Sequence, residues 1–282
     1  MRWKGRKESS NVEDRRGMSP GGKGLVGGGI GTIAIVLVVL LLGGDPTSIL
    51  QNVQLDDQTT NSNYTETAEE KELAQFVGVV LAETESVWHA IFKDAGSTYR
   101  EPKLVLFSGK VESACGVAGA STGPFYCPGD EKLYIDLSFF EELQKRFKAP
   151  GDFAMAYVIA HEVGHHIQNL TGVMDKMNDL RSKLSQEEYN QYSVRVELQA
   201  DFYAGIWAHY TEQRDLLESG DLEEALNAAS AVGDDNIQKQ AQGYVVPESF
   251  THGTSAQRKK WFHKGFTSGD IRQGDTFAAR DL

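Results

Sequence analysis

The sequence predicts an α+β fold: a mostly helical domain with a small β-sheet, preceded by one N-terminal transmembrane helix. Beyond residue 67, most of the chain repeats apolar residues at the spacing of helices that bury one face. Two short runs, 103–107 and 132–137, have the apolar and aromatic composition of strands. Residues 24–43 carry no charge and are about as long as a bilayer-spanning helix.

The N-terminus and the apolar segment together predict a membrane topology. Residues 1–23 hold seven Lys/Arg and three acidic residues, so the positive-inside rule keeps this segment in the cytoplasm. A cleaved signal peptide is the alternative, but the apolar core is longer than in such peptides, which favours a retained anchor. We therefore expect a single-pass cell-membrane protein in which a flexible polar linker, 44–66, leads to an extracytoplasmic (periplasmic) domain, 67–282.

The net charge limits the kinds of binding partner that the protein can have, and the cysteines indicate its compartment. The net charge is −12, and because residues 1–23 contribute +4, the remainder carries −16, which argues against nucleic acid as the main partner. The two cysteines, Cys115 and Cys127, lie in one Gly-rich segment. A disulfide between them is favoured in an oxidising compartment, and two free thiols or a second metal site are the alternatives.

The first half of the domain is expected to mix helices and strands. A helix begins near Thr67 and ends at Gly96, before the strand at 103–107. A loop with little periodicity runs through both cysteines and joins the strand at 132–137 as a hairpin-like unit. That second strand is expected to offer an edge with which an extended peptide can pair.

The second half is expected to be helical. A short amphipathic helix spans 139–147, and Asp152 is placed as the N-cap of the next helix, which Gly172 closes. Ser185 begins a capping box that starts a long helix ending near Tyr210. Two shorter helices, and a last one that carries Trp261, follow.

The helix after Asp152 contains an H-E-x-x-H motif. His161 and His165 are one helical turn apart, so both imidazoles project from one face and can hold one metal ion. Glu162 is rotated by about 100° from His161, which suits a carboxylate that reaches a bound water rather than the metal. The motif alone is also compatible with a solvated helix face, but the apolar residues that precede it predict a buried helix that needs a partner such as zinc.

Two acids on the long helix supply the rest of a metal site. Glu197 and Asp201 are one turn apart amid apolar residues. Glu197 is predicted as the third zinc ligand, which leaves a fourth position for water, and Asp201 as the acceptor of a histidine ring N–H. The alternative is that both acids pair with Arg195 or Lys183 on a wet face.

The remaining histidines near these segments are candidates for further ligands or catalytic residues. A third histidine on the motif helix itself is excluded, because Gln168 and Thr171 stand where that class needs Gly and His. His166 points away from the shared face and is interpreted as a supporting or surface residue. His252, in a loop of small polar residues, either reaches into a cleft or has no role.

Six segments together resemble the bacterial family of neutral zinc metallopeptidases, membrane proteins of the zincin type. The similarity covers most of the chain, and it is carried by Met1–Arg6 with Asn11–Gly17, by Gly123–Pro128, by the H-E-x-x-H motif, by Glu197–Asp201 and by His252–Arg258. The resemblance implies a zincin-like catalytic domain of the gluzincin arrangement.

In residue terms, the resemblance implies His161, His165 and Glu197 as ligands of one Zn²⁺, Glu162 as general base and Asp201 as the residue that supports a ligand histidine. A transition-state donor is expected in His252 or a tyrosine such as Tyr203. The expected activity is hydrolysis of peptide bonds in a peptide or protein substrate. A catalytically silent zinc scaffold at the envelope and a zinc hydrolase of another substrate are the alternatives.

Overall fold

A computed structural model describes residues 1–18 and 64–282. The helices are α3 (Ala68–Asp94), α4 (Ser138–Lys145), α5 (Asp152–Leu170), α6 (Val173–Arg181), α7 (Gln186–Glu212), α8 (Asp221–Ala231), α9 (Asp234–Gln242) and α10 (Ser255–Ser268). The strands are β1 (Val12–Asp14), β2 (Lys103–Phe107), β3 (Lys110–Ser113), β4 (Gly116–Gly119), β5 (Phe125–Cys127) and β6 (Lys132–Asp136). The predicted mostly helical α+β class is confirmed.

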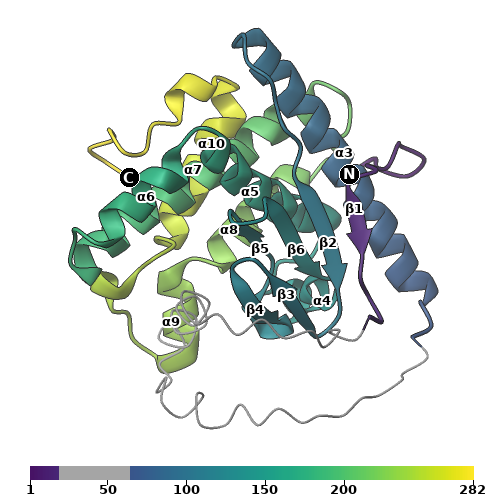
Figure 1. Cartoon of the computed structure of the whole chain (residues 1–282), viewed down its shortest axis with the longest axis horizontal. Helices are drawn as coiled ribbons and strands as arrows, with labels where there is room; N and C mark the ends of the chain where they lie inside the picture. Colours follow the sequence, from purple (N-terminus) through teal and green to yellow (C-terminus); the bar gives the residue numbers. More distant parts are fainter. Residues whose placement is uncertain (19–63) are drawn as a thin grey trace.

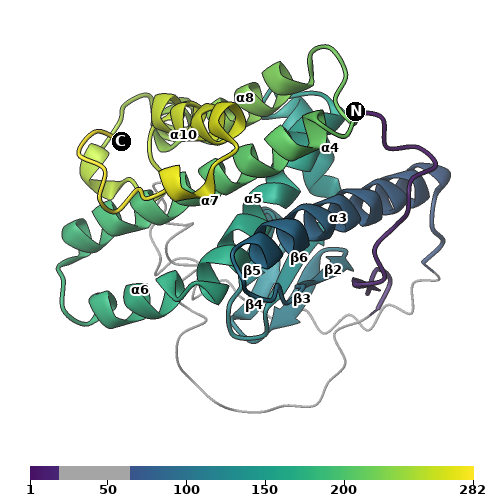
Figure 2. The same ribbon diagram turned by 90° about the horizontal axis from the view of Figure 1, so that it is seen from above.

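The described residues form three layers. The sheet lies on one side, α3 and α5 lie against it, and α7, α8 and α10 cover α5 from the far side (Figures 1 and 2). The H-E-x-x-H helix, α5, is therefore the central element: it contacts the sheet through β5 and the outer layer through α7 and α8. This position explains why α5 is buried around almost its whole circumference.

Most helix boundaries follow the local signals. Thr67 and Ser185 cap α3 and α7 through complete capping boxes, and Gly172 adopts the left-handed conformation just past the end of α5. The prediction that Asp152 caps α5 is wrong. Gly151 is the N-cap, and the Asp152 carboxylate instead accepts a hydrogen bond from the Met1 amino group at 2.7 Å.

The start of α5 is capped from another helix. The Glu224 carboxylate of α8 accepts from the backbone N–H of Phe153 at 3.0 Å. Only glycine fits at position 151, since its φ is 116° and a Cβ there would overlap Glu224. A non-local carboxylate thus replaces the local cap that the sequence suggested.

The four-stranded sheet has the order β1-β2-β6-β5. β6 pairs parallel with β2 and antiparallel with β5, so it lies inside the sheet. The prediction that residues 132–137 offer a free edge is therefore wrong, and the edge next to α5 belongs to β5. The predicted structureless loop contains the β3–β4 hairpin as well as β5, because its short, Gly-rich strands are too brief for periodicity to reveal.

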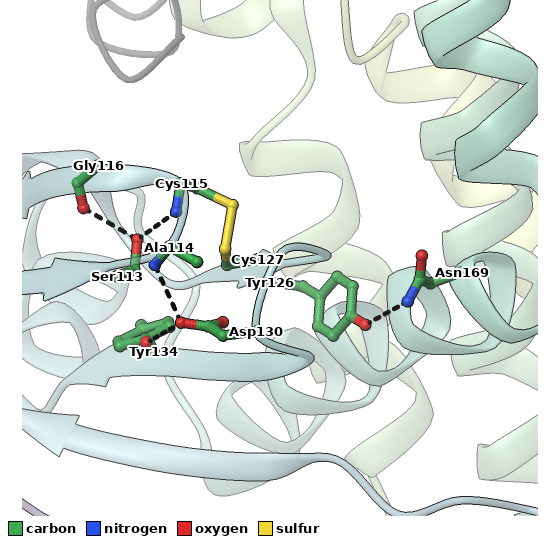
Figure 3. Close-up of a disulfide and its surroundings, with 9 residues drawn as sticks. All are labelled: Ser113, Ala114, Cys115, Gly116, Tyr126, Cys127, Asp130, Tyr134 and Asn169. Carbon is green, nitrogen blue, oxygen red and sulfur yellow. Dashed lines mark hydrogen bonds between the residues drawn. A yellow bond between two sulfur atoms is a disulfide. The ribbon is translucent and has the colours of Figure 1, made fainter. Parts of the chain in front are cut away.

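The predicted disulfide between Cys115 and Cys127 is present, with 5.8 Å between the Cα atoms (Figure 3). Cys127 is the last residue of β5 and is fully buried, whereas Cys115 lies just after β3. The bridge therefore ties the edge strand to the β3–β4 hairpin.

The N-terminal residues belong to the same folded unit as the rest. Val12–Asp14 pairs parallel with β2 as strand β1, and the Trp3 ring packs edge-on against Phe76 of α3. No local pattern in the sequence predicts this strand. The predicted transmembrane helix at 24–43 lies outside the described residues, and within the described ranges no helix is long and apolar enough to cross a membrane.

The outer layer depends on a close crossing of α7 and α10. A Cβ at Gly205 would overlap the carbonyl oxygen of Phe262, and one at Gly265 would overlap that of Phe202. Two facing glycines therefore let the helix backbones touch, which buries Trp207 and Trp261 beside them.

We predict that Gly205→Ala destabilises the protein by about 1–3 kcal/mol, because the backbones must separate to admit a methyl group. This loss opposes the gain of about 1 kcal/mol that alanine normally brings to a helix. The measurement is urea unfolding, with Asn178→Ala on the exposed face of α6 as the control that leaves stability within about 0.5 kcal/mol. A Gly205→Ala protein as stable as the parent would show that the crossing can relax.

Candidate zinc site

Three predicted ligands converge between α5 and α7. His161 Nε2 lies 3.2 Å from Glu197 Oε2, and His165 Nε2 lies 3.5 Å from Glu197 Oε1. One ligand atom from each residue lies within 4.8 Å of the others. The alternative pairing of the acids with Arg195 is wrong, since Arg195 donates to backbone carbonyls such as Ala279 O.

The spacing and chemistry of these atoms fit zinc. Two ligand atoms at about 2.0–2.1 Å from a tetrahedral zinc stand about 3.3 Å apart, close to both observed separations. Each histidine also has its Nδ1 next to an oxygen acceptor, which leaves Nε2 as the nitrogen that can bind a metal ion. Two imidazoles and a carboxylate form a donor set that zinc favours.

Asp201 contacts the ring of the first histidine. Its Oδ1 accepts from His161 Nδ1 at 2.8 Å and from the Tyr157 hydroxyl at 2.5 Å. Its two oxygens also accept from Arg258 Nε and Nη2 at 2.8 and 2.9 Å. Burial alone would raise the pKa of Asp201, but Arg258 and His161 hold it below its usual value, so Asp201 is a buried anion with full partners.

Gln168 plays the matching part for the second histidine. Its Oε1 accepts from His165 Nδ1 at 2.8 Å, and its Nε2 donates to Val196 O at 2.7 Å and to Gln199 Oε1 at 3.1 Å. Gln168 therefore links the His165 ring to the turn of α7 that carries Glu197.

Glu162 lies beside the ligands but does not join them. Burial raises its pKa to about 7, an effect that His161 opposes and Glu197 reinforces. The backbone of Tyr126 of β5 opposes this rise, and Tyr126 and Glu162 line the same cleft. A carboxyl group poised near neutrality can accept and return a proton at physiological pH.

His252 enters the cleft from the loop before α10. Its Nδ1 lies 3.1 Å from Asp234 Oδ1, while Asp234 Oδ2 accepts from the backbone N–H groups of Thr251, His252 and Gly253. Burial lowers the pKa of His252, but the negative charges of Glu197 and Asp234 outweigh this effect and raise it above its usual value. Asp234 thus holds both the loop and the ring in place.

Two residues lie elsewhere. Tyr203, suggested as a donor, is buried against Trp88 and does not line the cleft, so that suggestion is wrong. His166, interpreted as a supporting residue, is fully buried and bonds the Tyr126 hydroxyl and Arg100 O. His166 therefore connects α5 to β5 and does not contact the candidate ligands.

Sequence reasoning missed four residues: Tyr157, Gln168, Asp234 and Arg258. The first two had a local signal, because they lie one turn before His161 and three residues after His165 on the motif helix. Arg258 and Asp234 meet their partners only through tertiary packing, so no spacing in the sequence could have predicted their roles.

The cleft over these residues has a volume of 530 Å³. Its lining combines the candidate ligands, Glu162, His252 and Arg258 with mostly apolar side chains from β5, α4, α5, α6, α7 and α9. This size is within the range of ligand-binding pockets.

The site thus has the components of a zinc-dependent hydrolase: two histidines of one helix, a glutamate of the next and a buried carboxylate beside them. In agreement, the chain belongs to the family described as "Putative neutral zinc metallopeptidase", whose model matches residues 1–277.

Two relatives cover most of the chain. The protein named "Uncharacterized protein YpfJ" from Escherichia coli strain K12 is 49% identical over 285 residues, covering 98% of this chain and 99% of its own. "Uncharacterized protein Rv2575" from Mycobacterium tuberculosis strain H37Rv is 40% identical over 257 residues, or 86% of each chain. No solved structure matches significantly.

We predict that Gln168→Met lowers zinc affinity by about 10–100-fold, because a thioether of similar size cannot hold the His165 ring N–H. Zinc affinity is measured by competition with a chelator. Gln238→Met is the matched control: Gln238 is an equally buried glutamine of α9 that bonds Val246 and Ser249. Equal zinc affinities in the two variants would contradict the role of Gln168.

Proposed function

We propose that this protein is a zinc-dependent endopeptidase of the gluzincin type, with one Zn²⁺ held by His161, His165 and Glu197. The observation that carries the proposal is the buried Glu162 beside three convergent ligand atoms. A zinc site that serves only structure needs no carboxylate there, so Glu162 favours an enzyme over a silent scaffold.

The bound zinc would supply a Lewis acid for the substrate carbonyl and a lowered pKa for water. Glu162 then accepts the proton of the attacking water and returns it to the leaving amine. His252, held by Asp234 at the cleft wall, donates to the developing oxyanion. Asp201 and Gln168 keep the two imidazoles fixed throughout.

The substrate best suited to this cleft is an extended peptide. β5 is the edge strand of the sheet on the side of α5, and its residues Phe125 and Tyr126 line the cleft. Backbone groups of an edge strand can pair with an added strand, which places a peptide bond across the ligands. A non-peptide substrate would leave this edge unused.

We predict that Glu162→Gln keeps zinc but lowers peptide hydrolysis by about 10²–10⁴-fold, since the amide cannot accept the proton. The measurements are zinc content by elemental analysis and chelator-sensitive cleavage of a mixed peptide library. Glu187→Gln, an exposed acid in the first turn of α7, is the control that should cleave like the parent.

The proposal fails if Glu162→Gln cleaves as fast as the parent protein. It also fails if the zinc-loaded parent cleaves no peptide in the library, in which case a scaffold or a hydrolase of another substrate takes its place. Neither experiment tests the predicted anchor at 24–43 or the predicted periplasmic location.

A further inference from the structure

The walls of the cleft differ in character from the rest of the protein. The chain carries a net charge of −12, yet every charged side chain that lines the cleft belongs to the site itself: His161, Glu162, His165, Glu197, His252 and Arg258. The other lining side chains are uncharged, and most are apolar. A substrate side chain that enters the cleft therefore meets no counter-ion outside the catalytic groups.

The apolar side chains form two groups along α5. Toward the beginning of the helix, Val158 lies about one turn before His161, and Phe139 of α4 and Pro124 line the same cleft. Beyond the end of the helix, Met174 and Met177 of α6 continue the same wall. The candidate ligands lie between the two groups.

A third apolar group is close in sequence to Asp234, which holds the His252 ring. It consists of Val232 and Ile237, which are only partly buried and line the same cleft. Phe139 and Met174 are also partly buried. Partly exposed apolar side chains that share one cavity gain free energy when another apolar group covers them, by about 25 cal/mol per Å².

We infer that the cleft selects peptides with bulky apolar side chains on both sides of the scissile bond and rejects charged ones. This inference rests on the proposed function, because it names the substrate class of the same site. Methionines adapt to different shapes, so the site should accept several apolar residues rather than one. A charged side chain would lose its hydration without gaining a partner.

The test is binding rather than cleavage. Zinc-loaded Glu162→Gln protein is mixed with a library of short blocked peptides, and the retained peptides are sequenced. We expect enrichment of Leu, Ile, Met and Phe at two positions, and about tenfold weaker binding when either position holds Asp or Lys. The inference is overturned if the protein retains charged peptides, if it retains peptides with no preference for any residue, or if it retains no peptide.

A paired variant checks the position of the apolar wall. Met174→Glu, at a partly buried residue of α6, should shift the preference at one position toward Lys and Arg, while Met174→Leu should leave it unchanged. Identical preferences in both variants would overturn the role of α6. Cleavage by the parent protein remains the separate test of the proposed function, so the two can fail independently.

A second inference comes from residues 1–18 and does not involve the zinc site. β1 is hydrogen-bonded to β2 from Val12 to Asp14, and the Glu13 carboxylate accepts from Lys132 of β6 at 3.1 Å. Asn11 donates to Glu85 at 2.9 Å, and Arg6 donates to Glu83 of α3 at 3.1 Å. This segment is therefore built into the domain by backbone and side-chain bonds.

The two described ranges also meet where they are interrupted. Arg16 is buried, and its guanidinium donates to Asp14 at 2.9 Å and to Glu66 at 2.7 Å. The Arg16 guanidinium also lies over the ring of Tyr64, with 5.9 Å between the guanidinium carbon and the ring centroid. Residues on either side of positions 19–63 thus lie next to each other on one face.

We propose that residues 1–18 and the zinc site lie on the same side of any membrane. A chain that crosses once between residue 18 and residue 64 would place β1 and β2 on opposite sides, and their pairing could not form. The predicted cytoplasmic N-terminus and periplasmic domain are therefore incompatible with the sheet. Docking of this segment would also make it a stabilising part of the domain.

Thiol labelling in spheroplasts tests this topology. Both native cysteines form the disulfide, so one introduced cysteine gives the only free thiol. Lys7→Cys and Lys239→Cys place that thiol on exposed residues of the N-terminal segment and of α9. We expect both to react with a membrane-impermeant maleimide, or both to react only after lysis. Reaction of one without the other overturns the proposal.

Discussion

The buried carboxylate of Asp201 is the constraint on which the structure depends. Asp201 belongs to α7 and is fully shielded from solvent. Its carboxylate accepts hydrogen bonds from His161 and Tyr157 of α5 and from Arg258 of α10. A buried charge that loses its partner costs several kcal/mol. Any slip of one of these three helices would leave Asp201 or Arg258 unpaired, so the network fixes their register. The orientation of the His161 ring follows from the fold.

The distance between the ligand helices has an equally local origin. A Cβ at Gly164 would lie 2.9 Å from the Ala200 carbonyl oxygen, so α5 and α7 approach as closely as a glycine allows. Gly164 lies between the two candidate ligand histidines, His161 and His165, in sequence, and Ala200 lies about one turn after Glu197. The glycine therefore sets the separation of the His and Glu side chains. Ligands borne on two packed helices are more precisely held than ligands on loops.

The sequence revealed what is encoded locally. The helix start near Thr67, the capping box at Ser185, the turn spacing of His161 and His165, and the cysteine pair each depend on neighbours in the chain, and each prediction agrees with the structure. Glu197 and Asp201 were found because two acids on an apolar helix face need an explanation. Strand β1 was missed because three residues carry no usable period. Arg258 and Asp234 were missed because only tertiary packing brings them to their partners.

The proposed chemistry requires the two halves of the fold to stay in register, since the ligands lie on helices and the peptide edge lies on the sheet. Tyr126 of β5 joins the two: its hydroxyl bonds both His166 and Asn169 of α5, the latter at 3.1 Å (Figure 3). The next residue, Cys127, is bridged to Cys115. Closing a loop of this size contributes roughly 3 kcal/mol to stability, but its position has a further effect. A short edge strand with one neighbour would otherwise fray, and the bridge and the tyrosine hold both of its sides beside Glu162.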